Sequence, residues 1–533
     1  MSSESKYALI TGAAILTLAG LISRVTGFFY RIFLSHSIGA EGMGIYQMIF
    51  PVYGFCFALV VSGMQTAISR SCAASWAAGR PRQAKTSFLA GFSLSLGLSL
   101  VIAFLLHGQA GRLAKLLSMD SRCIPLLQLI AFGIPFGVVH TCISAYYYAR
   151  NKTAVPAAAQ LLEQFTRVGA SLVIWQIFLA EGKSPSPALA VGGLLAGELA
   201  SSLFSGICIL VHFQDPSLRR GPSGSFWRNQ RELTVLALPL AANRVLLTLL
   251  QSGEAILIPG HLVLSGMTSD DALTLFGVFS GMAMPFILFP SAITGSVSTL
   301  LLPTVAAAEA RGNEEGIRRA TEKTIQYCLL LGILAAGVFF FYGDAMGRTV
   351  FHSAQAGIFI RILSFVCPFL YLTGTLSSIL NGLGHTTLCF WQNVAGLLIR
   401  IGFVVLAVPG FGIQGYLWGI LASQLAVTAL NLIFLRKQFV FSVSAWDWIV
   451  KPAAALAVCM GISLLFQSLL GRLALPGLAV LAASLLAAGL IYLGLLHMIG
   501  LLPDLPLPSK NRNNHESGRP DCRRPDGAGG NNG

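Results

Sequence analysis

Nine arginine and glutamate side chains lie within long apolar segments of this sequence, and their chemistry offers the first indication of function. They are Arg24, Arg31, Glu163, Arg167, Glu198, Arg244, Glu254, Arg361 and Arg400. An ionised side chain in hydrocarbon is costly, so such residues usually bind a substrate or an ion, or pair with one another. Arginines suit phosphate and diphosphate groups, whereas glutamates in such segments suit cations and protons.

Two arginines of the first apolar segment share one face of a helix. This face consists of residues at steps of three or four, namely Ala13, Thr17, Gly20, Arg24, Gly27 and Arg31. Leu and Ile occupy the other faces, so the stripe is not expected to contact lipid. At 1.5 Å per residue the two arginines stand roughly 10 Å apart along the axis, which suits a diphosphate. We predict that both bind substrate; alternatively, Arg31 snorkels to the membrane surface and Arg24 binds neighbouring carbonyl groups.

Three other charged residues and one repeated arginine are candidates for ion coupling or for structural ion pairs. Glu163 and Arg167 are spaced i and i+4, so they can neutralise each other on one helix. Arg167 recurs as Arg400 in an internal repeat, which favours a structural role. Glu198 becomes Gln424 in the second copy, which indicates interhelical hydrogen bonding first and proton coupling second.

Arg244 and Glu254 lie in one apolar segment, on roughly opposite sides of the expected helix. At least one of them should therefore point toward the other half of the protein or into a cavity. Both are predicted to contact substrate, because charges inside the membrane commonly do.

Three prolines are candidates for hinges. Pro51 and Pro285 occupy equivalent places in two repeated segments, and Pro290 adds another break. A proline inside a helix kinks it, and matching kinks could permit a transporter to open alternately to each side. The alternative is that these prolines reflect only the general frequency of proline in transmembrane helices.

The elements that must position these residues are membrane-spanning helices. The chain of 533 residues is 55% hydrophobic and only 11% charged, with a mean hydropathy of +0.72, whereas soluble proteins are about 25% charged. Apolar runs of about 20 residues, the length of a transmembrane helix, recur from Tyr7 to Ile499. Within these runs, polar and apolar residues do not alternate as they do in the strands of a transmembrane β-barrel. The sequence therefore predicts an all-α integral membrane protein.

We predict about 14 transmembrane helices. They span approximately Tyr7–Leu34, Met43–Ser69, Thr86–Leu106, Cys123–Ala149, Val155–Ala180, Ala188–His212, Leu233–Pro259, Asp271–Leu302, Thr324–Tyr342, Gly357–Asn381, Thr387–Val408, Ile413–Leu435, Trp448–Leu470 and Leu475–Ile499. With the N-terminus inside, 23 of the 35 lysines and arginines fall in inner segments and 6 in outer segments. The positive-inside rule thus predicts that both termini are cytoplasmic.

An internal repeat predicts the arrangement of these helices. At an offset of 233 residues, Ser144, Thr153, Arg167 and Gly169 recur as Ser377, Thr386, Arg400 and Gly402. Spans 1 to 6 and 7 to 12 are thus two copies with the same orientation. This predicts two parallel six-helix lobes around a central cavity, with two C-terminal helices added.

The predicted domains follow from the repeat and from composition. They are an N-terminal lobe (residues 1–212), a cytoplasmic linker rich in Gly, Pro, Ser and Arg (213–231), a C-terminal lobe (232–437), helices 13 and 14 (438–502) and a disordered cytoplasmic tail (503–533).

Several classes of function lack support in the sequence. Walker A, GxSxG, HExxH and DxD motifs are absent, which argues against ATP-driven pumps and most hydrolases. With no CxxC and no close pair of histidines, we expect no metal site; we also expect no cofactor and no enzymatic activity. The net charge of +14 is interpreted as a topology signal, so no nucleic-acid partner is expected.

Several motifs together resemble a known family of exporters. They are GLISRVTGFFYR (Gly20–Arg31), IGAEGMGIYQMIFPVYG (Ile38–Gly54), EAILIP (Glu254–Pro259), GMAMP (Gly281–Pro285) and LLLP (Leu300–Pro303). They resemble the branch of polysaccharide exporters that includes stage V sporulation protein B, over about residues 6 to 500. This branch belongs to the multidrug/oligosaccharidyl-lipid/polysaccharide (MOP) superfamily, together with the lipid II flippases.

The resemblance implies a fold, a transport mechanism and further site residues. It implies two six-helix lobes plus a terminal pair, which rock to carry a lipid-linked sugar across the membrane. An SRxxGF stretch of the lipid II flippases, which contributes an essential arginine, matches Ser23, Arg24, Gly27 and Phe28 here, so Ser23 and Gly27 join the predicted substrate site. The flippases have further arginines late in their second helix and in their eighth, where this chain is apolar or small. The last two helices are implied to hold the lipid tail.

The leading hypothesis is a bacterial flippase or exporter in the cytoplasmic membrane. Its cargo would be an undecaprenyl-diphosphate-linked cell-wall precursor, such as lipid II or a related glycan of peptidoglycan or sporulation pathways. The expected partners are this lipid-linked oligosaccharide, membrane lipids and a coupling ion, and the expected functional unit is a monomer. The alternative is a multidrug and toxic-compound extrusion (MATE) type antiporter for drugs or cations, coupled to Na⁺ or H⁺. A membrane glycosyltransferase is a third, weaker hypothesis.

Overall fold

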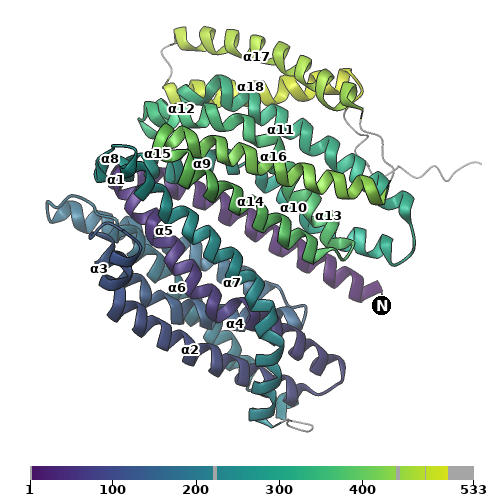
Figure 1. The fold of residues 1–533 in the computed structure, drawn as a ribbon. Helices are drawn as coiled ribbons and strands as arrows, with labels where there is room; N and C mark the ends of the chain where they lie inside the picture. Colours follow the sequence, from purple (N-terminus) through teal and green to yellow (C-terminus); the bar gives the residue numbers. More distant parts are fainter. Residues whose placement is uncertain (1–2, 220–224, 440–443, 474–475, 502–533) are drawn as a thin grey trace, which may run out of the picture.

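The computed structural model describes residues 3–219, 225–439, 444–473 and 476–501, and these residues form helices and short connections with no strand among them. The helices run side by side in a single bundle (Figure 1). In that view α2, α3, α4 and α6 lie on one side, α11, α13 and α16 lie on the other, and α1 and α7 run between them.

Six predicted spans form the first lobe. Its helices are α1 (Ser3–Ala77), α2 (Pro81–Leu116), α3 (Cys123–Ala131), α4 (Gly133–Ala149), α5 (Ala154–Ala180) and α6 (Ala188–His212). Two predicted spans lie within α1, which is interrupted at Gly39, where φ is +70° and a side chain would be strained. At Pro51 the backbone angles of α1 remain helical, and the hinge predicted at that residue stays a prediction.

The second lobe repeats this plan with more interruptions. Its helices are α7 (Phe226–Leu264), α8 (Ser269–Gly277), η2 (Val278–Ala283), α9 (Met284–Leu288), α10 (Ser291–Glu309), α11 (Glu314–Phe351), α12 (Ala354–Leu363), η3 (Ser364–Val366), α13 (Cys367–Gly382), α14 (Thr386–Leu406), α15 (Val408–Phe411) and α16 (Ile413–Gln438). The eighth span runs from α8 to α10. It contains a π-helical turn, η2, just before Pro285, and it breaks between α9 and α10 at Pro290. Both prolines therefore lie at interruptions, as predicted.

The two added spans lie beside α11 at the edge of the second lobe (Figure 1). A π-helical turn, η4 (Trp446–Val450), leads into α17 (Lys451–Leu470), and a short 3₁₀ turn, η5 (Gly471–Leu473), follows it before α18 (Gly477–Met498). In the described part of the chain, 13 helices are long and apolar enough to cross a membrane. This number differs from the 14 predicted spans for three reasons. Helix α1 is counted once although it contains two predicted spans, α5 is not counted, and the interrupted eighth span is counted as two helices. Each of the 14 predicted spans therefore has a helix, and the predicted all-α membrane fold is confirmed.

The two lobes meet closely at the end of the bundle where α1 breaks, which we call the Gly39 end. A Cβ atom on Gly44 would stand 2.0 Å from the carbonyl oxygen of Leu273, and one on Gly277 would stand 2.0 Å from that of Ala40. Only glycine permits this approach of α1 and α8. The opposite end, from which the linker between the lobes emerges, is called the linker end.

Two polar contacts join the lobes at the Gly39 end. Arg122 binds Glu41 and Asp120 in the first lobe and reaches Asp270 of α8 at 2.6 Å. Hydrogen bonds from Arg122 hold the pKa of Asp120 below its ordinary value, so the bond between these two side chains of the first lobe is present at neutral pH and is lost as the pH falls through that lowered pKa. It holds Arg122 in place beside Asp270. The second contact is a hydrogen bond of 3.1 Å between a ring nitrogen of His36 and one of His352.

Acidification should loosen the Gly39 end through the histidine pair. A hydrogen bond between two imidazoles needs one unprotonated nitrogen, and burial and the neighbouring ring of His352 lower the pKa of His36. Lowering the pH from about 8 to 5 therefore favours full protonation of the pair, which replaces attraction with repulsion. Spin labels placed by Lys115→Cys and Arg348→Cys, at exposed positions of the two lobes, should show a longer distance at the lower pH. His352→Gln should reduce this shift, whereas His107→Gln should leave it unchanged. An equal shift in His352→Gln would exclude the pair as its cause.

Candidate functional site

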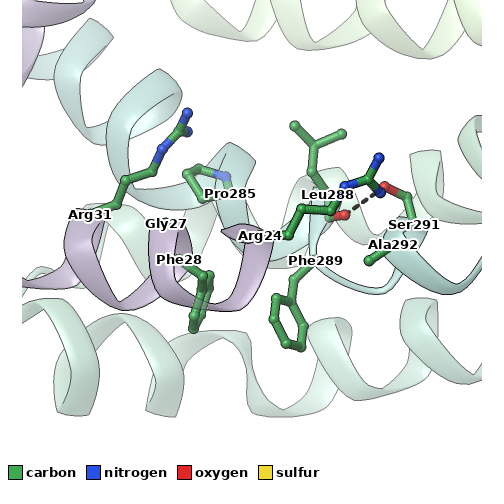
Figure 2. A pocket seen from close by; sticks show the side chains of 9 residues that line it. All are labelled: Arg24, Gly27, Phe28, Arg31, Pro285, Leu288, Phe289, Ser291 and Ala292. Atoms are coloured by element: carbon green, nitrogen blue, oxygen red, sulfur yellow. Dashed lines mark hydrogen bonds between the residues drawn. The ribbon is translucent and has the colours of Figure 1, made fainter. Parts of the chain in front are cut away.

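Arg24 and Arg31 line one cavity between α1 and the interrupted eighth span. The cavity has a volume of about 380 Å³. Its other lining residues are Gly27, Phe28, Pro285, Leu288, Phe289, Ser291 and Ala292. Figure 2 shows both arginine side chains on the side of α1 that faces Pro285, while the rings of Phe28 and Phe289 point the opposite way. The predicted face of the first span is thus a cavity wall, and Gly27 lies in it.

Neither arginine of this cavity is neutralised within the described part of the chain. Arg24 and Arg31 make no hydrogen bond or ion pair there, and both retain exposed surface. Ser291 donates its hydroxyl hydrogen to the carbonyl oxygen of Leu288 at 2.6 Å (Figure 2). Two unpaired guanidinium groups in one cavity create a positive potential that would attract an anion.

A smaller cavity of about 180 Å³ continues along α1 beyond Arg24. It is lined by Leu16, Thr17, Gly20, Leu21, Arg24, Ala292, Gly295, Ser296 and Thr299. A Cβ atom on Gly295 would stand 3.1 Å from a terminal nitrogen of Arg24. The small residues on α1 and α10 thus leave room for the guanidinium group, which borders both cavities.

A second charged site lies in a separate cavity of about 400 Å³ between α1, α7, α14 and α16. There Arg400 pairs with Glu254 at 3.2 Å, and the hydroxyl of Tyr416 donates to the other carboxylate oxygen at 2.8 Å. Ser252 of α7 donates to the carbonyl oxygen of Pro51 at 2.8 Å. The sequence predicted a role for Glu254 and Arg400 individually, and the structure brings them together as one pair.

A third group of polar residues lies inside the first lobe. Arg167 pairs with Glu163 on α5, as the spacing predicted. Glu198 of α6 accepts hydrogen bonds from Tyr53 of α1 at 3.2 Å and from His140 of α4 at 3.0 Å. The interhelical hydrogen bonding predicted for Glu198 is therefore present, with partners that the sequence did not identify.

Two other residues of the predicted substrate site, Arg244 and Ser23, do not belong to any of these three groups. Arg244 is exposed on α7 and lines neither of the two larger cavities. The hydroxyl of Ser23 is buried without a partner in the described part of the chain. Arg361 lies 3.7 Å from Asp344, with both side chains about half exposed.

Sequence reasoning missed His140, Tyr53 and Tyr416. The three lie in different helices, and each meets its glutamate only through tertiary packing. A usable signal did exist for the two tyrosines, because a phenol within an apolar helix usually finds a hydrogen-bond partner when buried.

Two solved structures share this fold. The lipid II flippase MurJ in an inward closed conformation aligns with a TM-score of 0.70 at 14% identity, over 91% of this chain and 98% of that chain. A multidrug resistance MATE family transporter of the MOP superfamily, in an inward-facing conformation, aligns with a TM-score of 0.62 at 17% identity, over 78% and 94%. The chain therefore has the fold of these two membrane proteins, with two helical lobes and charged cavities.

The sequence shows the family to which the protein belongs. Residues 9–309 match the model of the polysaccharide biosynthesis protein family, so the chain belongs to this family. Stage V sporulation protein B of Bacillus subtilis (strain 168) is 26% identical over 469 residues, which cover 86% of this chain and 89% of that protein. The resemblance predicted from the motifs is confirmed.

The pair of Glu254 and Arg400 should be structural, and a double-mutant cycle can test this. Removing one partner of a buried pair leaves an uncompensated charge and costs up to about 3 kcal/mol, whereas removing both costs less. Glu254→Gln and Arg400→Gln should each lower the thermal unfolding midpoint of the purified protein, and the double variant should recover part of the loss. Glu181→Gln, in an exposed pair with Lys183, is the control. If the double variant instead lowered the unfolding midpoint by the sum of the two single losses, direct pairing of Glu254 and Arg400 would be excluded.

Proposed function

We propose that this protein is a flippase for an undecaprenyl-diphosphate-linked cell-wall precursor, lipid II or a related lipid-linked glycan. The observation that carries this proposal is the cavity in which Arg24 and Arg31 are both unpaired. An unneutralised charge inside a membrane protein is costly unless a ligand compensates it. A diphosphate supplies the required negative charge and has oxygens to engage two guanidinium groups.

The size and walls of the cavity also support a substrate of this class. The two cavities that Arg24 borders, of about 380 and 180 Å³, together approach the volumes usual for ligand sites. Small and hydroxylated residues line the smaller one, including Thr17, Ser296 and Thr299, and they can hydrogen-bond a sugar. The aromatic and aliphatic residues beside Arg31 suit the apolar part of a lipid-linked cargo. Helices α17 and α18 could accommodate the lipid tail, by analogy with the flippases.

We infer alternating access as the mechanism. The contacts at the Gly39 end close one side of the molecule, and the distribution of Lys and Arg predicts that this side is the outer one. Both termini would then be cytoplasmic, in a bacterial cytoplasmic membrane, with a monomer as the functional unit. Opening requires the lobes to separate at Gly44 and Gly277, and the interruptions at Pro285 and Pro290 provide candidate hinges.

The second candidate function is a MATE-type antiporter for drugs or cations. The fold similarity to a multidrug resistance transporter favours it. Its carboxylates would be Glu163, Glu198 and Glu254, but each of these already has a hydrogen-bond or ion-pair partner. The unpaired arginines would also repel a cationic drug. The charge of the cavity therefore favours an anionic cargo.

Substitution of Arg24 should abolish flipping without loss of the protein. In cells depleted of their own lipid II flippase, wild-type protein should restore lipid II on the outer surface, detected with an external probe. Arg24→Ala should reduce this exposure at least about tenfold, because losing a hydrogen-bonded charge contact with the bound diphosphate costs about 2 kcal/mol or more. Arg24→Lys should retain part of it. Arg112→Ala, at an exposed position of α2, is the control for expression.

The outcomes separate the two candidate functions. Restoration by wild type and Arg112→Ala, but not by Arg24→Ala, supports the flippase and its anion site. No restoration at normal membrane levels removes lipid II as cargo and directs the search to other lipid-linked glycans. Export of a cationic drug that depends on Glu254 but not on Arg24 would establish the antiporter instead.

A further inference from the structure

We infer that His140, Glu163 and Glu198 form a proton-binding site inside the first lobe, separate from the cavities that contain Arg24 and Glu254. One ligand atom from each of the three residues lies within 4.8 Å of the other two. The residues come from α4, α5 and α6, so the site exists only in the folded lobe. The existence of this site does not depend on the proposed cargo.

The polar atoms of this site are directly connected. His140 Nε2 lies 3.0 Å from Glu198 Oε2, and the Tyr53 hydroxyl donates to Glu198 Oε1 at 3.2 Å. Arg167 binds Glu163 one helical turn away on α5. Glu198 is 6% exposed, so its charge must be balanced by neighbouring groups and not by water.

Glycine residues make room for these side chains where the helices approach one another. A Cβ atom on Gly137 would stand 3.1 Å from Glu198 Oε2 and 3.3 Å from the Tyr53 hydroxyl. A Cβ atom on Gly197 would stand 2.7 Å from the carbonyl oxygen of Glu163. Alanine at Gly137 would crowd the Glu198 carboxylate, and alanine at Gly197 would push α6 away from the backbone of α5, so both glycines support the close packing around this cluster.

The cluster contains one more negative charge than permanent positive charge. Two carboxylates, Glu163 and Glu198, face a single permanent cation, Arg167. The other titratable groups in contact are His140 and Tyr53, and a tyrosine is neutral at physiological pH. One negative charge therefore remains, and a proton on His140 neutralises it. The imidazolium would donate to Glu198 from Nε2.

More distant charges do not alter this count within the hydrogen-bonded cluster. Tyr30 and Tyr46 of α1 lie near Arg167 and are neutral. Arg31 also interacts electrostatically with Arg167, but its guanidinium group borders the cavity at α9 and α10. Its charge is therefore available to a ligand in that cavity and is not held against Glu198.

A proton fits this site better than a metal ion. Both oxygens of Glu198 already accept hydrogen bonds, and Arg167 holds one oxygen of Glu163 and would repel a divalent cation. The site in the second lobe provides a useful comparison, because there one carboxylate, Glu254, faces one arginine, Arg400, and the charges balance. Among the residues that the structure describes, the additional glutamate and histidine are found in the first lobe, so the proposed proton site is specific to that lobe.

Buried hydroxyl groups extend from this site along α6. Ser201 and Ser205 lie three and seven residues after Glu198, on the same side of the helix, and each is at most 1% exposed. Neither hydroxyl has a partner in the described part of the chain. Further along, at the linker end, His212 Nε2 lies within hydrogen-bond distance of the Tyr146 hydroxyl and of the Arg150 guanidinium group. The inward side of α6 is therefore polar at several positions between Glu198 and the linker end.

The protonation state of His140 can be measured directly. Full-length protein with ¹⁵N-labelled histidine, reconstituted into vesicles of phosphatidylethanolamine and phosphatidylglycerol, should show His140 as an imidazolium at pH 7, assigned from the signal lost in His140→Gln. Glu198→Gln and Glu163→Gln each remove the uncompensated negative charge, so each should convert His140 to neutral imidazole. Glu181→Gln, an exposed position beside the end of α5, should leave the imidazolium unchanged.

Several outcomes would overturn the proton site. A neutral His140 in the wild-type protein at pH 7 would do so, as would an imidazolium that persists in both Glu198→Gln and Glu163→Gln. If Na⁺ or Zn²⁺ displaced the proton from the wild-type protein, the cluster would be a metal site instead. Since Glu198→Gln could fail to fold, Glu163→Gln, which retains the contact between His140 and Glu198, keeps the test decisive. No lipid substrate is present, so failure here and failure of the proposed flippase activity are distinguishable.

Discussion

The high cost of an isolated charge in hydrocarbon is the constraint on which this structure depends. Helices satisfy the backbone of a membrane protein internally, so the charged side chains determine which helix faces can meet lipid. Glu163 and Glu254 are each paired with an arginine, and Glu198 is hydrogen-bonded between helices. Arg24 and Arg31 instead face a cavity. In the proposed function, a ligand supplies the missing negative charge at these two unpaired arginines.

The two lobes share an architecture but use it for different chemistry. Arg167 and Arg400 are equivalent in the internal repeat, yet Arg167 pairs within its own helix and Arg400 pairs across helices with Glu254. The second lobe balances one carboxylate with one arginine. The first lobe has an additional carboxylate, Glu198, with a histidine beside it. Duplication thus preserved the helix framework, while substitutions at a few interior positions gave each lobe its own charge balance.

Sequence periodicity predicted features that depend on one helix and could not predict those that depend on several. The 14 spans, the stripe that contains Arg24 and the i, i+4 pair on α5 follow from spacing along the chain, and the structure contains them. The contact between His140 and Glu198 joins α4 and α6, whose relative rotation no single-helix pattern specifies. The break of α1 at Gly39, where φ is +70°, is another feature that spacing along the chain did not predict.

Helix α1 links the proposed anion site to the proposed proton site. It carries Arg31 at the cavity and Tyr53 at Glu198, and Arg31 also lies within electrostatic range of Arg167. An anion that neutralises Arg31 would lower the positive potential around the cluster, which favours the proton on His140. By reciprocity, protonation of His140 would favour binding of the anion to the same degree. A diphosphate and a proton would then bind cooperatively to one lobe, so this linkage by itself favours their joint movement and not the exchange of one for the other.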